Sequence, residues 1–283
     1  MKITRTISDM SKAIEPVKKK QRTVGFVPTM GYLHKGHMSL VKKARNQNDM
    51  TVVSIFVNPA QFGPGEDYNK YPRDLARDEK LLNEEGVDVL FSPSVNEIYP
   101  EGYRTYVNVD QISEALCGRS RPGHFRGVTT IVMKLFNIVK PDTVYLGQKD
   151  AQQAVIIKRM AQDLDTGIAI NVLPTVREKD GIAMSSRNVY LSEKERADAP
   201  VLWEALSAAK KLVDDGARDT ERIKAEMRRL IITKKSARID YVSVASLREL
   251  KELKEIEGGV LIALAVWIGK TRLIDNIVIG GKI

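Results

Sequence analysis

The sequence predicts an α/β fold in which a doubly wound parallel sheet is followed by a smaller α+β domain. Up to about residue 176, short β-branched apolar runs alternate with amphipathic stretches, as in a parallel sheet with helical crossovers. Beyond that point, apolar strands are separated by turns too short for crossover helices. A chain of 283 residues is long enough for two domains. We therefore expect a Rossmann-like domain at 1–176 and a smaller domain at 177–283.

Hydrophobic periodicity places the elements of the first domain. Gly86 follows the second expected helix and is a typical helix stop. The expected helices cover 38–47, 73–85, 128–139 and 150–164, and the expected strands cover 24–27, 51–57, 87–91, 143–146 and 168–173. Such helix–strand alternation is typical of doubly wound sheets, which bind ligands beyond the carboxyl ends of their strands.

The second domain has a different pattern. Surface helices are expected at 192–214 and 220–233, followed by strands at 239–244, 260–267 and 271–278. Because short turns join antiparallel neighbours, the three strands predict a small antiparallel sheet.

Composition excludes several classes of protein. No apolar run approaches the roughly 18 residues of a membrane span, and residues 1–7 lack a secretory pattern, so we expect a cytoplasmic protein with no membrane partner. The single cysteine, Cys117, cannot form an internal disulfide and is expected in the core. The net charge of +9 by itself is compatible with nucleic acid, an anionic membrane or anionic small substrates. Acids interleave with the basic residues, as in 251–255, and aromatic residues are only 6%, which argues against nucleic acid.

The strongest local signal is the segment 28–37, PTMGYLHKGH, between the first strand and the first helix. A helix N-terminus at this edge of a sheet offers backbone amides to phosphate. Gly31 and Gly36 allow close approach of the backbone, and His34 and His37, three residues apart, can turn toward the same side. The pattern predicts two imidazoles facing a polyphosphate.

This segment has other interpretations. The two histidines could bind zinc with His124, but there is no HExxH pattern and no acid within the segment. They could also be structural residues of a helix cap, and this alternative stays open. Gly269 to Thr271 resembles the end of a Walker A loop, but Leu264 stands where its first glycine belongs.

A resemblance narrows these interpretations. Residues 34–37, HKGH, resemble the HxGH signature of the nucleotidylyltransferase superfamily that includes class I aminoacyl-tRNA synthetases. Four blocks in the same order as in the pantothenate synthetase family extend the likeness over most of 20–195: 30–37, 57–63 (VNPAQFG), 147–153 (GQKDAQQ) and 184–188 (MSSRN).

This resemblance implies ATP-dependent condensation of (R)-pantoate with β-alanine through a pantoyl adenylate, with Mg²⁺. It further implies a homodimer and a C-terminal domain that closes over the active site. The catalytic residues would be His34, His37 and Lys149. The residues implied to bind ATP are Met30, Gly31, Tyr32, Leu33, His34, Lys35, Gly36, His37, Gly147, Gln148, Lys149, Asp150, Val176, Met184, Ser185, Ser186 and Arg187.

The side chains suit these roles chemically. Lys149 and Arg187 are fixed cations suited to phosphate oxygens, and Ser185 and Ser186 add hydroxyl donors. The family uses the glutamines matching Gln61 and Gln153 for pantoate, and the former also for β-alanine. Neutral amides can hold a carboxylate without blunting its attack.

Other assignments depend more loosely on the likeness. Asn58 is expected to support the substrate pocket, and Asp78 is a candidate magnesium ligand. Segment 63–73 could be a mobile lid or a connector, and the resemblance favours the lid. For the basic segment 119–126 the resemblance leaves contact with phosphate or substrate open, without a role for any individual residue.

Two alternative functions remain open. One is a related nucleotidylyltransferase that moves AMP onto a phosphate, although phosphate acceptors usually recruit cations rather than glutamines. The other is a nucleic-acid-binding module that uses a nucleotide only for regulation.

Overall fold

A computed structural model describes residues 1–283 and divides them into two compact units. The first unit comprises Met1–Ser113, Arg121–Gly147 and Ile156–Leu173, and the second comprises Glu114–Ser120, Gln148–Val155 and Pro174–Ile283. Each unit therefore draws on more than one stretch of the chain. The assignment of ATP and pantoate binding to 1–176 and of a closing role to 177–283 stays a prediction.

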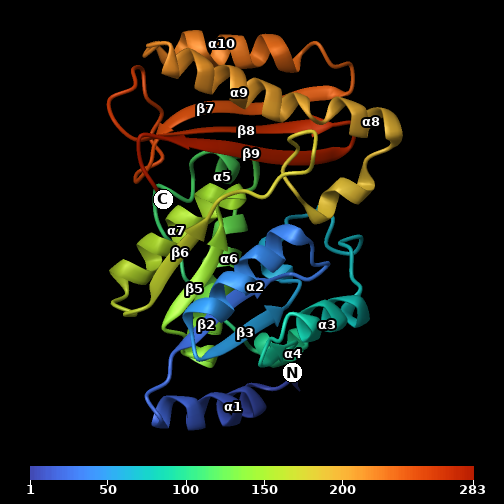
Figure 1. Ribbon diagram of the computed structural model, residues 1–283, viewed down its shortest axis with the longest axis vertical. Helices are drawn as coiled ribbons and strands as arrows, with labels where there is room; N and C mark the ends of the chain where they lie inside the picture. Colours follow the sequence, from blue (N-terminus) through green and yellow to red (C-terminus); the bar gives the residue numbers. More distant parts are fainter. The chain divides into compact units, whose positions relative to one another are not determined.

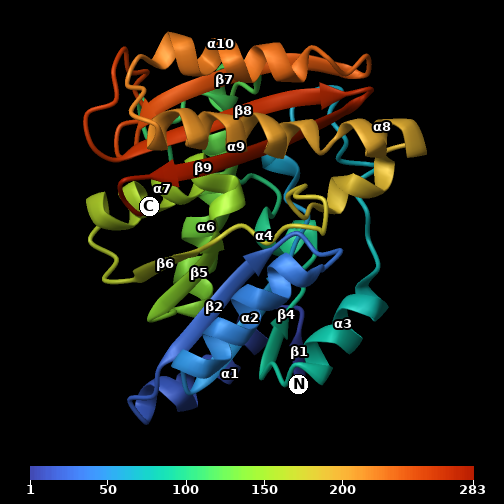
Figure 2. The same ribbon diagram turned by 45° about the horizontal axis from the view of Figure 1, so that its top comes forward.

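The first unit is built on a six-stranded sheet in the order β1-β4-β3-β2-β5-β6, in which every pairing is parallel (Figures 1 and 2). Successive strands run outward from β2 to β4, and the chain then returns to the other side of β2 with β5. The strands are β1 Lys2–Thr4, β2 Val24–Thr29, β3 Met50–Ile55, β4 Val89–Phe91, β5 Thr143–Gly147 and β6 Ala169–Leu173. The predicted doubly wound sheet is confirmed.

Helices cover both faces of this sheet. Apolar residues of α2 and α3, including Leu40, Val41 and Leu82, pack with Val27 and Val53 of the sheet in one buried cluster. The helices are α1 Ile7–Lys19, α2 Lys35–Gln47, α3 Leu75–Glu84, α4 Val95–Ile98, α6 His124–Val139 and, from Ile156 on, α7 Ala151–Asp163, with the 3-10 turn η1 Pro59–Gln61. The 3-10 turn η2 Gln148–Asp150 belongs to the second unit. Sequence analysis did not predict β1 or α1, and Pro16 within α1 is a residue that usually ends a helix.

The second unit contains a three-stranded antiparallel sheet, as predicted. Its order is β7-β8-β9, with β7 Ala237–Ser246, β8 Val260–Ile268 and β9 Thr271–Ile279. Helices α9 Val201–Asp214 and α10 Thr220–Ile231 lie on one face of it (Figures 1 and 2). They bury Leu202, Leu206 and Met227 against the sheet. The unit also holds α5 Cys117–Ser120, whose Cys117 is buried as expected.

The helix predicted at 192–214 is wrong in one respect, because the structure divides it in two. Helix α8 spans Glu193–Asp198 and begins with a capping box between Ser192 and Glu195. Pro200 then precedes α9. Proline has no N–H to continue the hydrogen bonding of a helix and clashes with the preceding turn, so the chain restarts there. None of the helices combines the length and the apolar composition needed to cross a bilayer.

Candidate functional site

The loop after β2 begins with two residues in the left-handed region. Gly31 has φ of +86° and Tyr32 has φ of +51°. Thr29 links the start of this loop to β3, because its Oγ1 donates to the Ser54 carbonyl at 2.8 Å and accepts from the Gly31 N–H at 3.1 Å. Since β2 lies between β3 and β5 in the sheet, this loop begins at the switch point where open α/β sheets bind ligands.

A buried carboxylate holds the same loop. Asp78 of α3 is only 1% exposed, and its two oxygens accept the N–H groups of Tyr32 at 2.6 Å and Leu33 at 2.8 Å. Arg77 completes the attachment by donating to the Leu33 carbonyl at 2.8 Å. Burial raises the pKa of Asp78, although the two N–H groups and Arg77 act in the opposite direction. Asp78 thus fixes the backbone of the loop from the side of α3.

This geometry bears on the expected magnesium site. A magnesium ligand must offer oxygen to the ion, whereas both oxygens of Asp78 already accept backbone N–H groups. No group of three His, Cys, Asp or Glu side chains gathers anywhere in the chain to hold a metal. The residues present therefore do not fit a protein-built magnesium cage, and Asp78 as a magnesium ligand stays a prediction.

The two histidines form the N-terminal cap of α2. His34 Nδ1 accepts from the Gly36 N–H at 3.1 Å, and His37 Nδ1 accepts from the His34 N–H at 3.3 Å. The rings lie 4.0 Å apart between centroids. A neutral imidazole that accepts at Nδ1 carries its proton on Nε2, so each ring can donate from its outer nitrogen. The helix-cap interpretation is confirmed, and it is compatible with a phosphate role.

The 3-10 turn η1 brings three further site residues together. Gln61 Nε2 donates to Met30 Sδ at 3.2 Å, and Gln61 Oε1 accepts from Asn58 Nδ2 at 3.1 Å. Asn58 itself is 1% exposed. Gln61 thus contacts the Met30–His37 loop, and the buried Asn58 holds Gln61 through the hydrogen bond to its Oε1.

The basic segment 119–126 supplies a clamp for this turn. The Gln61 carbonyl accepts from His124 Nδ1 at 2.8 Å and from Arg121 Nη2 at 3.3 Å. Arg121 also donates to His124 Nε2 at 3.0 Å and forms a two-point ion pair with Glu66. Burial acts to raise the pKa of Glu66, but Arg121 outweighs it and the pKa lies below its usual value. His124 is therefore engaged in holding backbone.

In the second unit, the turn that carries Lys149 is held by β9. Asn276 Nδ2 donates to the carbonyls of Gln148 and Lys149, each at 2.9 Å. The Lys149 ammonium lies 3.4 Å from Asp150 Oδ1. The backbone of the turn is thus fixed by the Asn276 amide, whereas the Lys149 side chain forms an ion pair with Asp150.

A buried ion pair supports Asn276 in turn. Asp275, 2% exposed, accepts from Arg177 at 2.6 and 3.0 Å and from the Asn276 N–H at 2.7 Å. The Arg177 guanidinium also lies 3.7 Å from the centre of the Trp203 ring. Burial raises the pKa of Asp275, and Arg177 opposes that rise.

The expected ATP contacts at 176 and 184–187 lie around a hairpin of the second unit, whereas Gly147 is the last residue of β5 in the first unit. The Met184 N–H donates to the Val176 carbonyl at 3.0 Å, which pairs two of the expected residues directly. Ser185 caps the 3-10 turn η3 Ser186–Tyr190 by accepting from the Arg187 N–H at 3.3 Å. Gln153 lies in the first turn of α7.

Sequence analysis missed several residues that hold these segments. Asp275 and Asn276 had a signal, since a polar pair inside the apolar strand TRLIDNIVI is unusual unless it has buried partners. Arg121 and His124 belong to the basic segment 119–126, for which the sequence predicts no role in holding the backbone. Gly127 of α6 gave no signal in the sequence, although a Cβ there would lie 2.1 Å from the Ala60 carbonyl oxygen.

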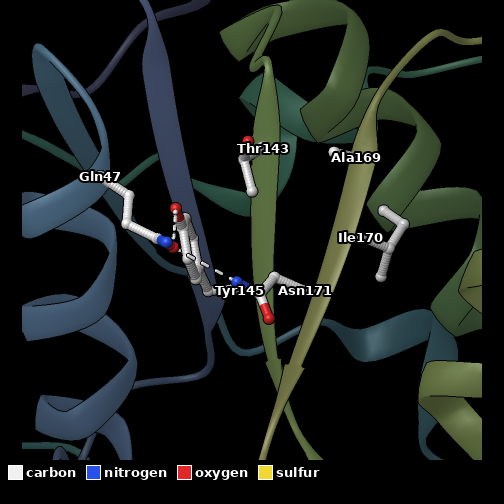
Figure 3. Close-up of a pocket in the computed structure, with 6 residues that line it drawn as sticks. All are labelled: Gln47, Thr143, Tyr145, Ala169, Ile170 and Asn171. Carbon is white, nitrogen blue, oxygen red and sulfur yellow. Dashed lines mark hydrogen bonds between the residues drawn. The ribbon is translucent and has the colours of Figure 1, made fainter. Parts of the chain in front are cut away.

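A separate pocket lies on the first unit (Figure 3). Gln47 is the last residue of α2. Its Oε1 accepts from Tyr145 OH at 3.1 Å and from Asn171 Nδ2 at 3.3 Å. The other lining residues are Thr143, Ala169 and Ile170. They belong to the first residues of β5 and β6, whereas ligands of such sheets bind beyond the carboxyl ends. This pocket is therefore no candidate for the site.

Comparison with known proteins decides the family. The model of the family described as pantoate-beta-alanine ligase matches residues 2–278. The chain belongs to this family. It is 53% identical to the pantothenate synthetase of Caldicellulosiruptor bescii over 100% of both chains, and 56% identical to that of Acetivibrio thermocellus over 99% of both.

Solved structures of the family agree. The pantothenate synthetase of Thermus thermophilus matches with a TM-score of 0.93 at 44% identity, covering 98% of this chain and 99% of that one. The pantoate-beta-alanine ligase of Francisella tularensis, described as complexed with beta-gamma ATP and beta-alanine, matches with a TM-score of 0.81 at 38% identity. It covers 98% of this chain and 97% of its own. The predicted family is confirmed.

Gly127→Ala tests the close packing of α6 on η1. The added Cβ would lie 2.4 Å from Ala60 C and 2.7 Å from Gln61 N, and backbone atoms cannot move aside cheaply. We expect the free energy of unfolding in urea to fall by about 1–3 kcal/mol. Gly63→Ala is the control, because its nearest contact would be an ordinary 3.8 Å. Equal unfolding midpoints for the two variants would contradict the packing argument.

Proposed function

We propose that this chain condenses pantoate with β-alanine at the expense of ATP, through a pantoyl adenylate, releasing AMP and pyrophosphate. Family membership across residues 2–278 supports the overall reaction. The observation that carries the chemistry is the cap of α2, in which each histidine accepts a backbone N–H at Nδ1, so a neutral ring carries its proton on Nε2. Two donors at a helix N-terminus suit the phosphates of ATP.

The two steps require no nucleophile from the protein. The pantoate carboxylate attacks the α-phosphorus and expels pyrophosphate, and the β-alanine amine then attacks the acyl carbon and expels AMP. Rate acceleration then comes from positioning and from donors aimed at developing charge. His34 and His37 donate to phosphate oxygens from Nε2, and Lys149 and Arg187 balance the charge of the phosphates.

Neutral amides suit the acyl substrate. We assign Gln61 to pantoate and β-alanine and Gln153 to pantoate. A cation would bind the pantoate carboxylate more tightly, but it would also draw off the electron density that must attack phosphorus. The contact of Gln61 with Met30 supports this assignment, because it joins the amide to the loop expected to bind ATP.

Magnesium enters the proposal only as the counterion that ATP carries, since the chain has no cluster of acidic or imidazole ligands for it. Formation of a homodimer, a cytoplasmic location and closure of the C-terminal domain stay predictions. The remaining ATP contacts, from Gly147 to Asp150 and from Val176 to Arg187, are proposed on the family likeness.

The reaction is tested by exchange of labelled pyrophosphate into ATP in the absence of β-alanine. Because adenylation is reversible and needs only the first two substrates, we expect exchange that depends on pantoate. Omitting pantoate is the matched control. Exchange supported by other carboxylates but not by pantoate would overturn the substrate assignment.

His37→Ala separates chemistry from helix capping. We expect adenylation to slow by about 10²- to 10³-fold, because a donor that strengthens as phosphate charge develops is lost. The helix also loses a cap worth about 1 kcal/mol. His37→Asn is the control, since its Oδ1 stands where Nδ1 accepts but it lacks the outer donor. If His37→Asn restores both the melting temperature and the rate, His37 only caps the helix.

Lys149→Ala should separate the two half-reactions. We expect adenylate formation to fall by about 10²-fold or more, while supplied pantoyl adenylate still reacts with β-alanine, since the second step involves no pyrophosphate. The turn should survive because Asn276 holds it through backbone carbonyls. Lys211→Ala, an exposed change on α9, is the control. Equal damage to both half-reactions would assign Lys149 to the fold.

A further inference from the structure

The orientation of the Asn58 amide is fixed by backbone groups. Its Oδ1 accepts from the Ala60 N–H at 3.3 Å, and its Nδ2 donates to the Gly127 carbonyl at 3.1 Å. An N–H can pair only with the oxygen and a carbonyl only with the NH₂ group, so the amide cannot be turned over. At 1% exposure, Asn58 has no water to replace a lost partner.

This fixed amide determines which end of Gln61 faces outward. Asn58 Nδ2 also lies 3.1 Å from Gln61 Oε1, and a donor there requires the oxygen of Gln61 to point inward. The Gln61 NH₂ group then points toward Met30, 3.2 Å from its sulfur. An isolated glutamine could present either its oxygen or its NH₂ group to a ligand. Here the structure presents the NH₂ group, which attracts a carboxylate instead of repelling it.

Tyr99 supplies a further hydrogen bond to the Asn58 amide. It follows α4, and its hydroxyl donates to Asn58 Oδ1 at 2.8 Å, the shortest contact that Asn58 makes. Its ring is held edge-on by Tyr103 at 5.0 Å and packs near Phe56 at 6.2 Å. Burial raises the pKa of Tyr99, so the hydroxyl keeps its proton and remains a donor.

We propose that Tyr99 is a positioning residue for the acyl substrates, acting through Asn58 to keep the NH₂ group of Gln61 turned toward the substrate carboxylates. The hydrogen bonds run in one direction, from the Tyr99 hydroxyl to Asn58 Oδ1 and from Asn58 Nδ2 to Gln61 Oε1. Without the bond from Tyr99, only the backbone groups of Ala60 and Gly127 restrain the Asn58 amide. The hydrogen bond from Asn58 Nδ2 to Gln61 Oε1 is then weaker. This inference rests on the proposed binding of pantoate and β-alanine by Gln61.

The test is a double-mutant cycle of Tyr99→Phe with Gln61→Ala in the full-length enzyme. Tyr99→Phe keeps the ring and removes only the donor. We expect it to raise KM for pantoate and for β-alanine about threefold to tenfold, while KM for ATP stays unchanged. In the Gln61→Ala background the same change should add nothing, because the amide that Tyr99 orients is gone. Tyr103→Phe is the matched control, since its ring packs on Tyr99 outside this chain of hydrogen bonds.

The outcomes separate the inference from the proposed function. If Gln61→Ala leaves KM for pantoate and β-alanine unchanged, the substrate role of Gln61 fails and the positioning role fails with it. If Gln61→Ala raises these constants while Tyr99→Phe does not, only the positioning role is overturned. Equal effects of Tyr99→Phe in both backgrounds, with a lowered melting temperature, would show that Tyr99 acts only on stability and would also overturn it.

Discussion

The Met30–His37 loop depends on one buried carboxylate. Tyr32 and Leu33 lie in a tight turn whose N–H groups have no strand or helix to pair with, and Asp78 accepts both. Burial of this charge is unfavourable, as the raised pKa shows, but removing it would leave two N–H groups unsatisfied. The turn leads directly into His34 and the first residues of α2. The hydrogen bonds to Asp78 therefore also help to fix the direction in which both imidazole rings point.

In the second unit, a neutral side chain rather than a carboxylate fixes the backbone of an irregular segment. The turn at 148–150 has carbonyls that need donors, and Asn276 supplies one NH₂ group to two of them. Asp275 and Arg177 then hold Asn276 in place. In both units an irregular segment carries the proposed chemistry, and a buried polar side chain on a regular element fixes its backbone. Irregular backbone with buried partners can be as well ordered as the helices around it.

The sequence predicted what depends on neighbours along the chain. Most strands and crossover helices follow from local periodicity, the HxGH signature follows from the family resemblance, and the helix cap is one of the open interpretations of His34 and His37. The points at which helices end were harder to predict, because a proline does not always end a helix. Pro16 lies inside α1, whereas Pro200 separates α8 from α9. The partners of the site could not be predicted, since Asn276 lies 127 residues beyond Lys149 and Tyr99 lies 41 beyond Asn58. Nor does a sequence show that Gly127 must lack a side chain, because the obstruction is the backbone of a distant turn.

In the polar residues of the proposed site, the atoms that hold the structure differ from the atoms to which we assign chemistry. In His34 and His37, Nδ1 holds the helix cap and Nε2 is the nitrogen that can donate to phosphate. In Gln61, the carbonyl and Oε1 are held by the protein, and Nε2, which lies beside Met30, is the atom that we propose meets the substrates. Deleting such a side chain removes both duties together and overstates its chemical role. A substitution that keeps the structural atom and removes the other, as asparagine does for histidine, measures the chemistry alone.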